Sequence, residues 1–107
     1  MSVFTVENYI VRAEKKSEFD VLLEEFRSFK ETHPELFEGL RSWKLFRQEY
    51  GSICGMYIEM WEYNSLGDME TINNRIFSNE NMRRIDQEFH QLIEPTSFSA
   101  SIWRQII

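Results

Sequence analysis

GSICGMYIEMWEY, residues 51–63, is the longest stretch of this chain that alternates with a period of two residues. Successive residues of a β-strand point to opposite faces of its sheet. One set of alternate side chains here is uniformly apolar: Cys54, Met56, Ile58 and Met60. The other set combines aromatic rings with one carboxylate: Ile53, Gly55, Tyr57, Glu59 and Trp61. Because a strand with two largely apolar faces must be covered on both, we predict a central strand, with helices on its methionine face and another layer on its tyrosine and tryptophan face.

The rest of the chain predicts three more strands and three helical segments. Residues 3–12, 40–50 and 97–107 alternate apolar side chains and predict strands, and a tight turn at 50–52 would join the second of them to residues 51–63 in a hairpin. Apolar residues recur at helical spacing from Ser17, the expected N-cap, to His33, and again over 66–76 and about 80–93. The order β-α-β-β-α-β, with the second helix broken in two, predicts one α+β, ferredoxin-like domain over residues 1–107 with a four-stranded antiparallel sheet.

One face of a ferredoxin-like sheet carries both helices and the other is bare. The alternation assigns five large side chains to the bare face: Trp43, Leu45, Tyr57, Trp61 and Trp103. An apolar patch of that size is rarely left in water by a monomer. We therefore predict a homodimer in which two sheets pack face to face and form an α/β barrel with the helices outside.

Composition argues against several classes of partner. The net charge is −6 and no run of Lys or Arg occurs, which argues against nucleic acid and against a membrane surface. No stretch approaches the ~18 apolar residues of a membrane span, so the cytoplasm is the expected location. The single cysteine, Cys54, is expected in the core. Asp86 and His90 stand one helical turn apart, but without a third ligand we expect an ion pair, no bound metal and no cofactor.

Glu59 is the candidate catalytic residue. The alternation places it between Tyr57 and Trp61, where burial would raise its pKa and suit it to proton transfer. The other interpretation is a structural carboxylate paired with an arginine, such as Arg12 or Arg41, or with a tyrosine hydroxyl. The residue pattern leaves both interpretations open.

Four further side chains are candidate ligand-binding residues. They are Asn8, Tyr57, Trp61 and Trp103. The rings of Trp43, Trp61 and Trp103 would line an apolar pocket between the sheets, or would form the core of the dimer interface, where aromatic residues are enriched.

Residues 57–66, YIEMWEYNSL, resemble the strand-to-helix passage of antibiotic-biosynthesis-type monooxygenases and NIPSNAP-like proteins, both of the dimeric α+β-barrel superfamily. In those proteins a Glu-x-Trp/Tyr pair closes the third strand. Residues 101–104, SIWR, are similar to the ends of some NIPSNAP-like chains. The pair Glu7-Asn8 resembles one in the haem-degrading monooxygenases of the superfamily, but those also need a tryptophan and a histidine on later helices. Here His90 is displaced and the tryptophan is missing, so haem is not expected.

The resemblance implies the fold more firmly than the function. The function it favours is a small-molecule-binding protein, a cofactor-free oxygenase or isomerase acting on an apolar or aromatic ligand. The alternative is a non-catalytic binding or structural homodimer with a packed interior. A cavity lined by Glu59, Tyr57, Asn8 and Trp61 would favour the first, and a filled interior the second.

Overall fold

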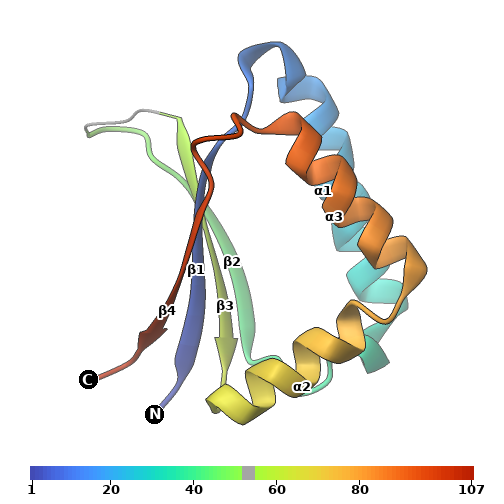
Figure 1. The fold of residues 1–107 in the computed structure, drawn as a ribbon, viewed down its shortest axis with the longest axis vertical. Coiled ribbons are helices and arrows are strands. Elements are labelled where there is room, and N and C mark those ends of the chain that lie inside the picture. Colours follow the sequence, from blue (N-terminus) through green and yellow to red (C-terminus); the bar gives the residue numbers. More distant parts are fainter. Residues whose placement is uncertain (52–54) are drawn as a thin grey trace.

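The computed structural model describes residues 1–51 and 55–107, so the expected place of Cys54 in the core, and part of the turn at 50–52, lie outside the described residues. The chain forms strands and helices in the predicted order (Figure 1). They are β1 (Val3–Ile10), η1 (Ala13–Lys15), α1 (Lys16–Thr32), η2 (Pro34–Phe37), β2 (Ser42–Arg47), β3 (Met56–Tyr63), α2 (Leu66–Ile76), α3 (Glu80–Leu92) and β4 (Ser99–Arg104).

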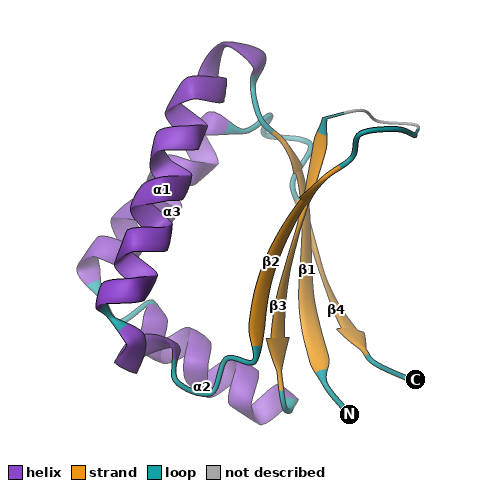
Figure 2. Cartoon of the chain, turned by 180° about the vertical axis from the view of Figure 1, so that it is seen from behind, coloured by secondary structure: helices purple, strands orange, loops and turns teal. Residues whose placement is uncertain are grey.

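The four strands form one sheet in the order β2-β3-β1-β4, and every neighbouring pair is antiparallel. All three α-helices lie on one side of this sheet (Figures 1 and 2). The predicted ferredoxin-like α+β architecture is therefore confirmed, including the hairpin of β2 and β3. Among the described residues, no helix has the length and apolar character needed to cross a membrane.

Side-chain caps explain why the second helical region is divided. Ser65 begins α2 by accepting a hydrogen bond from the backbone N–H of Asp68 at 3.1 Å. Asn79 begins α3 in the same way, with the N–H of Met82 as donor at 3.1 Å. A new cap at Asn79 gives the chain a fresh helix start with its own direction. The predicted cap at Ser17 is wrong, because η1 leads directly into α1 and Ser17 lies inside the helix.

The helices cover the opposite face of the sheet from the one predicted. Ring centroids of Phe19 and Tyr57 lie 5.0 Å apart, and those of Phe26 lie 5.0 Å from Trp43 and 5.8 Å from Trp61. Four of the five side chains assigned to the bare face therefore lie under the helices: Trp43, Leu45, Tyr57 and Trp61. Alternation separates two faces of a strand but does not say which one the helices cover when both are apolar. The phenylalanines of α1 pack against the aromatic set.

The open face of the sheet is still apolar at its centre, although mostly different residues form it. Strand register places eight large apolar side chains there: Phe4, Val6, Ile10, Phe46, Met56, Ile58, Met60 and Trp103. Phe46 is 51% exposed and Trp103 is 58% exposed. The polar side chains of this face lie largely on the edge strands, as with Lys44 of β2 and Ser99 of β4. The reason for predicting a face-to-face dimer therefore persists, with Trp103 as the only residue of the five in its expected place.

Candidate functional site

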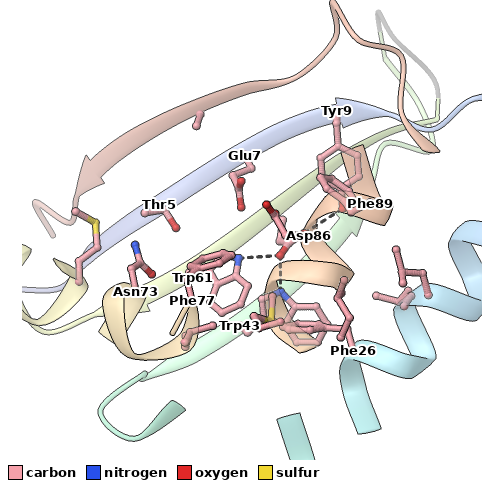
Figure 3. Close-up of a pocket in the computed structure, with 18 of the residues that line it drawn as sticks. Thr5, Glu7, Tyr9, Phe26, Trp43, Trp61, Asn73, Phe77, Asp86 and Phe89 are labelled. Carbon is pink, nitrogen blue, oxygen red and sulfur yellow. Dashed lines mark hydrogen bonds between the residues drawn. The ribbon is translucent and has the colours of Figure 1, made fainter. Parts of the chain in front are cut away.

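A cavity of about 580 Å³ lies between the sheet and the three helices (Figure 3). Its walls are mainly aromatic and aliphatic side chains, among them Phe26, Trp43, Trp61, Met69, Ile85 and Phe89. On β4, Ala100 and Ile102 line the cavity and are also exposed, so the cavity reaches solvent beside that strand. The side chains between the sheet and the helices therefore leave an open volume.

Glu59 projects from β3 into this interior and accepts three hydrogen bonds. The indole Nε1–H groups of Trp61 and Trp43 donate to its Oε2 at 2.7 and 2.9 Å, and the Tyr9 hydroxyl donates to Oε1 at 3.1 Å. Burial raises the pKa of Glu59, and these three donors oppose the rise because they favour the ionised carboxylate. These hydrogen bonds hold the carboxylate group of Glu59 in place, together with the three rings that carry the donors.

The alternative interpretation of Glu59 had named an arginine or a tyrosine hydroxyl as its partner. Arg12 instead donates to the Ile93 carbonyl, and Arg41 donates to Asn64. Tyr9 is the hydroxyl donor, and two indoles join it. The arginine is therefore wrong as a partner, whereas the tyrosine is present.

Glu7 stands directly opposite Glu59 in the register of β1 and β3. Its carboxylate points from β1 into the cavity (Figure 3). Burial, together with the nearby charges of Glu59 and Asp86, raises the pKa of Glu7 from 4.5 to about 7. A carboxyl group with this pKa changes its protonation state near neutral pH, which is the range in which a general acid or base works best.

Asp86 of α3 brings a third carboxyl group to the cavity lining. Burial raises its pKa, and His90 opposes that rise from one helical turn away, with its Nε2 at 3.7 Å from Oδ1. Both side chains of this pair are partly exposed, as predicted for a solvated ion pair. Within the described residues, no three His, Cys, Asp or Glu side chains are placed to hold a metal ion.

Asn73 of α2 supplies an amide to the same cavity. The Tyr63 hydroxyl donates to its Oδ1 at 2.9 Å, which leaves the Nδ2–H donors of the amide for another partner. Burial raises the pKa of Tyr63 to about 12, so its hydroxyl keeps its proton and stays a donor at neutral pH. This arrangement sets the orientation of the Asn73 amide.

The structure brings only some of the predicted site residues together. Glu59 and Trp61 line the cavity. Tyr57 lies beside it, buried and stacked on Tyr9 at a centroid distance of 5.7 Å. Asn8 and Trp103 lie on the open face, where the Asn8 amide donates to Ser99 at 3.2 Å. All of these residues were expected in a pocket between two sheets. For Glu59, Tyr57 and Trp61 that placement is wrong, because they lie on the helix-covered side of the sheet.

Sequence reasoning missed Glu7, Asn73 and the cavity-lining position of Asp86. Glu7 had a usable signal, since it shares the two-residue alternation of Tyr9 on a strand that a ferredoxin-like fold places beside β3. No signal in the sequence distinguished Asn73 and Asp86 from ordinary polar residues on a helix.

Neither a protein-family model nor a curated protein matches this sequence. Solved structures do match. A NIPSNAP family protein from Agrobacterium tumefaciens is 22% identical, with a TM-score of 0.74 over 97% of this chain and 85% of its own. A NIPSNAP-like domain protein from Burkholderia xenovorans is 15% identical, with a TM-score of 0.70 over 98% and 85%. A variant of SnoaB, a cofactor-independent oxygenase from Streptomyces nogalater, is 11% identical, with a TM-score of 0.68 over 99% and 94%.

These comparisons establish the fold. The chain has the ferredoxin-like α+β fold of NIPSNAP family proteins and of antibiotic-biosynthesis-type oxygenases, as the resemblance implied. At these identities the likeness does not carry a reaction from one chain to another. What this chain does must be argued from its own cavity.

Proposed function

We propose that this protein binds a small, largely apolar or aromatic molecule in the cavity between its sheet and helices, and moves a proton to or from it. The activities that fit are those of a cofactor-free oxygenase or an isomerase. The observation that carries the proposal is the cavity itself, about 580 Å³ with mainly apolar walls and carboxyl groups inside. Small-molecule sites typically have volumes of ~300–1,000 Å³ and a few polar groups among apolar walls.

The polar groups of the cavity limit the chemistry of the ligand. Three carboxyl groups line it, from Glu7, Glu59 and Asp86, and no Lys or Arg is among the described residues that do. An anionic ligand would be repelled there, whereas a neutral molecule with a hydrogen-bond donor would be matched. The fold likeness to SnoaB, a cofactor-independent oxygenase, is compatible with proton transfer by side chains alone.

A non-catalytic protein with a packed interior was the alternative function. The packed interior of that alternative is the space between two sheets, which one chain does not form. The open volume beneath the helices supports ligand binding, although the hydrogen bonds of Glu59 favour a structural part for that residue. A binding protein without turnover is therefore the second candidate. Turnover of a bound compound would separate the two.

The open face of the sheet supports a second proposal, that two copies of the chain pair through it. Its apolar centre on β1 and β3, with polar groups towards the edge strands, has the pattern of a protein interface. A face-to-face pair would cover Phe46 and Trp103, which are otherwise more than half exposed. In such a dimer each chain would keep its own cavity on the far side of its sheet.

Blocking the cavity mouth tests the ligand proposal. Ala100→Trp would place an indole at the opening beside β4, opposite Glu7 in the strand register, and Val21→Trp, on the exposed face of α1, is the matched control. Thermal unfolding is measured with and without 2-methoxynaphthalene. We expect the compound to raise the melting temperature of the wild type and the control but not of Ala100→Trp. Equal shifts in all three proteins would place binding elsewhere.

A further inference from the structure

The two carboxylates that face each other across β1 and β3 differ in how many partners they have. Resting on the function proposed above, we propose that Glu7 is the catalytic residue that takes a proton from the bound molecule, and that Glu59 is a positioning residue whose oxygens are occupied by three hydrogen-bond donors. The sequence had pointed to Glu59 for the chemistry.

Glu59 has little capacity left for a ligand. Its Oε2 already accepts from Trp43 and Trp61, and its Oε1 accepts from Tyr9. All three partners are donors, so they favour the ionised carboxylate, and a proton on Oε2 would compete with the two indoles that donate to that oxygen. Both oxygens of a group held this way are occupied, whereas a proton carrier needs a free lone pair directed at the ligand.

Glu7 has that free capacity. Among the described residues, none donates a hydrogen bond to its carboxylate, and no side-chain oxygen or nitrogen is both sealed from solvent and without a partner. The Glu7 oxygens must therefore face open space, and the open space next to them is the cavity. A bound hydroxyl or acidic C–H group would meet Glu7 before it met Glu59.

The surroundings of Glu7 make it a better base than an exposed carboxylate. Glu59 on β3 and Asp86 on α3 repel its charge. His90 acts on Asp86, whose pKa it lowers. Tyr9 and Tyr63 hold their protons, and the described cavity-lining residues of α1, α2 and β2 are uncharged. Burial and the two carboxylates raise the pKa of Glu7 to about 7, so that it accepts protons from weak acids while still being ionised in part at neutral pH.

The step itself needs only the ligand and Glu7. The O–H or C–H bond of the ligand breaks, its proton forms an O–H bond on a Glu7 oxygen, and the electron pair stays on the ligand. The Nδ2–H group of Asn73 is a donor for the resulting anion, because Tyr63 occupies the amide oxygen and leaves the amide nitrogen open. Returning the proton to a different atom of the ligand would complete an isomerisation.

The compound 2-naphthol can report this transfer directly. Its hydroxyl becomes strongly acidic on excitation, and it emits at a longer wavelength if a base in contact takes the proton. We expect naphtholate emission from the wild-type complex, increasing with a midpoint near the pKa of Glu7, about 7. Glu7→Gln should lower the ratio of naphtholate to naphthol emission by roughly tenfold or more. Glu7→Asp, which keeps a carboxylate, should restore part of it.

Glu59→Gln distinguishes the two carboxylates. Removing the neighbouring charge should keep the naphtholate emission but move its midpoint to lower pH, by about half a unit or more. Loss of emission in Glu59→Gln together with its survival in Glu7→Gln would overturn the assignment. So would a wild-type midpoint near 4.5, the ordinary value for Glu.

The compound 2-methoxynaphthalene, which has no proton to give, measures occupancy of the cavity independently. If it binds and Glu7→Gln leaves naphtholate emission unchanged, the role of Glu7 is wrong and the ligand proposal stands. If neither compound binds the wild type, both proposals fail together. If Glu7→Gln does not fold, the naphtholate emission of Glu7→Asp and the wild-type pH midpoint still test the role of Glu7.

Discussion

Both faces of the sheet carry large apolar side chains, but the two faces differ in the polar groups among them. The helix-covered face combines aromatic rings with Glu7 and Glu59 and surrounds a cavity. The open face carries methionine, isoleucine and valine on its central strands and no acidic pair at its centre. Carboxylates among aromatic rings cost stability unless they are hydrogen-bonded, protonated or wet. The helix-covered face therefore retains polar groups that cost stability, whereas the open face is suited to packing against another surface.

The largest expected effect concerns the packing under the helices. Phe26 is buried and meets Trp43, Trp61 and Phe37 at centroid distances of 5.0, 5.8 and 6.0 Å. Phe26→Ala should lower the free energy of unfolding by roughly 3–5 kcal/mol, because the rings around it cannot close the space. Chemical denaturation measures the change. Glu31→Ala, exposed on the same helix, should stay within about 0.5 kcal/mol, and similar losses from both would contradict this packing.

The next prediction breaks the open face. If two copies pair through it, sedimentation of the wild type should give about twice the chain mass of 13.0 kDa. Ile58→Lys, at the centre of the face on β3, should weaken the pairing at least about 100-fold, on the order of 3 kcal/mol, because the charge would be buried without a partner.

Lys44→Ala is the control, since Lys44 lies on the same face but on the edge strand β2. It should leave the mass unchanged. A wild type that sediments as a stable monomer would end the dimer proposal, while the cavity proposals would be unaffected.

The third prediction concerns the pH dependence of stability on the helix-covered face. The pKa of Glu7 rises from 4.5 in the unfolded chain to about 7 in the fold, so the folded state binds the proton more tightly. The stability this gives is complete below about 4.5 and is lost as the pH rises through about 7. Burial raises the pKa values of Glu59 and Asp86 as well, so they act in the same direction.

Glu7→Gln should therefore flatten the pH profile of unfolding. We expect the wild type to lose on the order of 2–3 kcal/mol more than the variant between about pH 4.5 and pH 7.5. Denaturant unfolding at a series of pH values measures the free energy of unfolding of the wild type and of the variant. Glu88→Gln, exposed on α3, should reproduce the wild-type profile, and a variant profile as steep as the wild type would mean that Glu7 titrates normally.

Most of the fold could be predicted from the sequence because it depends on periodicity. The alternation of residues 56–63 and the helical spacing after Ser65 and Asn79 specify each element, and their order restricts the topology. The face that the helices cover could not be predicted from alternation. The phenylalanines of α1 and the methionines of β3 are both apolar, and hydrophobic attraction does not discriminate between partners.

The site was predictable only in part for the same reason. Glu59 stood out because a single carboxylate interrupts an aromatic set, and the structure places it in the cavity lining. Asn8 was grouped with it from a resemblance, yet register places Asn8 opposite Ile58 on the other face. The alternation of β1 groups Glu7 with Tyr9, but its position opposite Glu59 depends on the register of two strands far apart in the chain, which local pattern does not contain.

The smallest expected effect compares one tryptophan on each face. Trp61 donates its indole N–H to Glu59 at 2.7 Å, whereas Trp103 is 58% exposed on the open face. Trp61→Phe keeps an aromatic ring but removes one donor from a buried carboxylate, which should cost about 1–2 kcal/mol at neutral pH. Because that donor opposes the raised pKa of Glu59, its loss should raise this pKa further, and the deficit should shrink as the pH falls and the carboxylate takes up a proton.

Trp103→Phe should cost less than about 0.5 kcal/mol with no such pH dependence, measured at a fixed protein concentration so that pairing does not differ between samples. Equal and pH-independent losses at the two positions would show that the indole of Trp61 matters for its size alone, and Glu59 would then be held by Trp43 and Tyr9 without it.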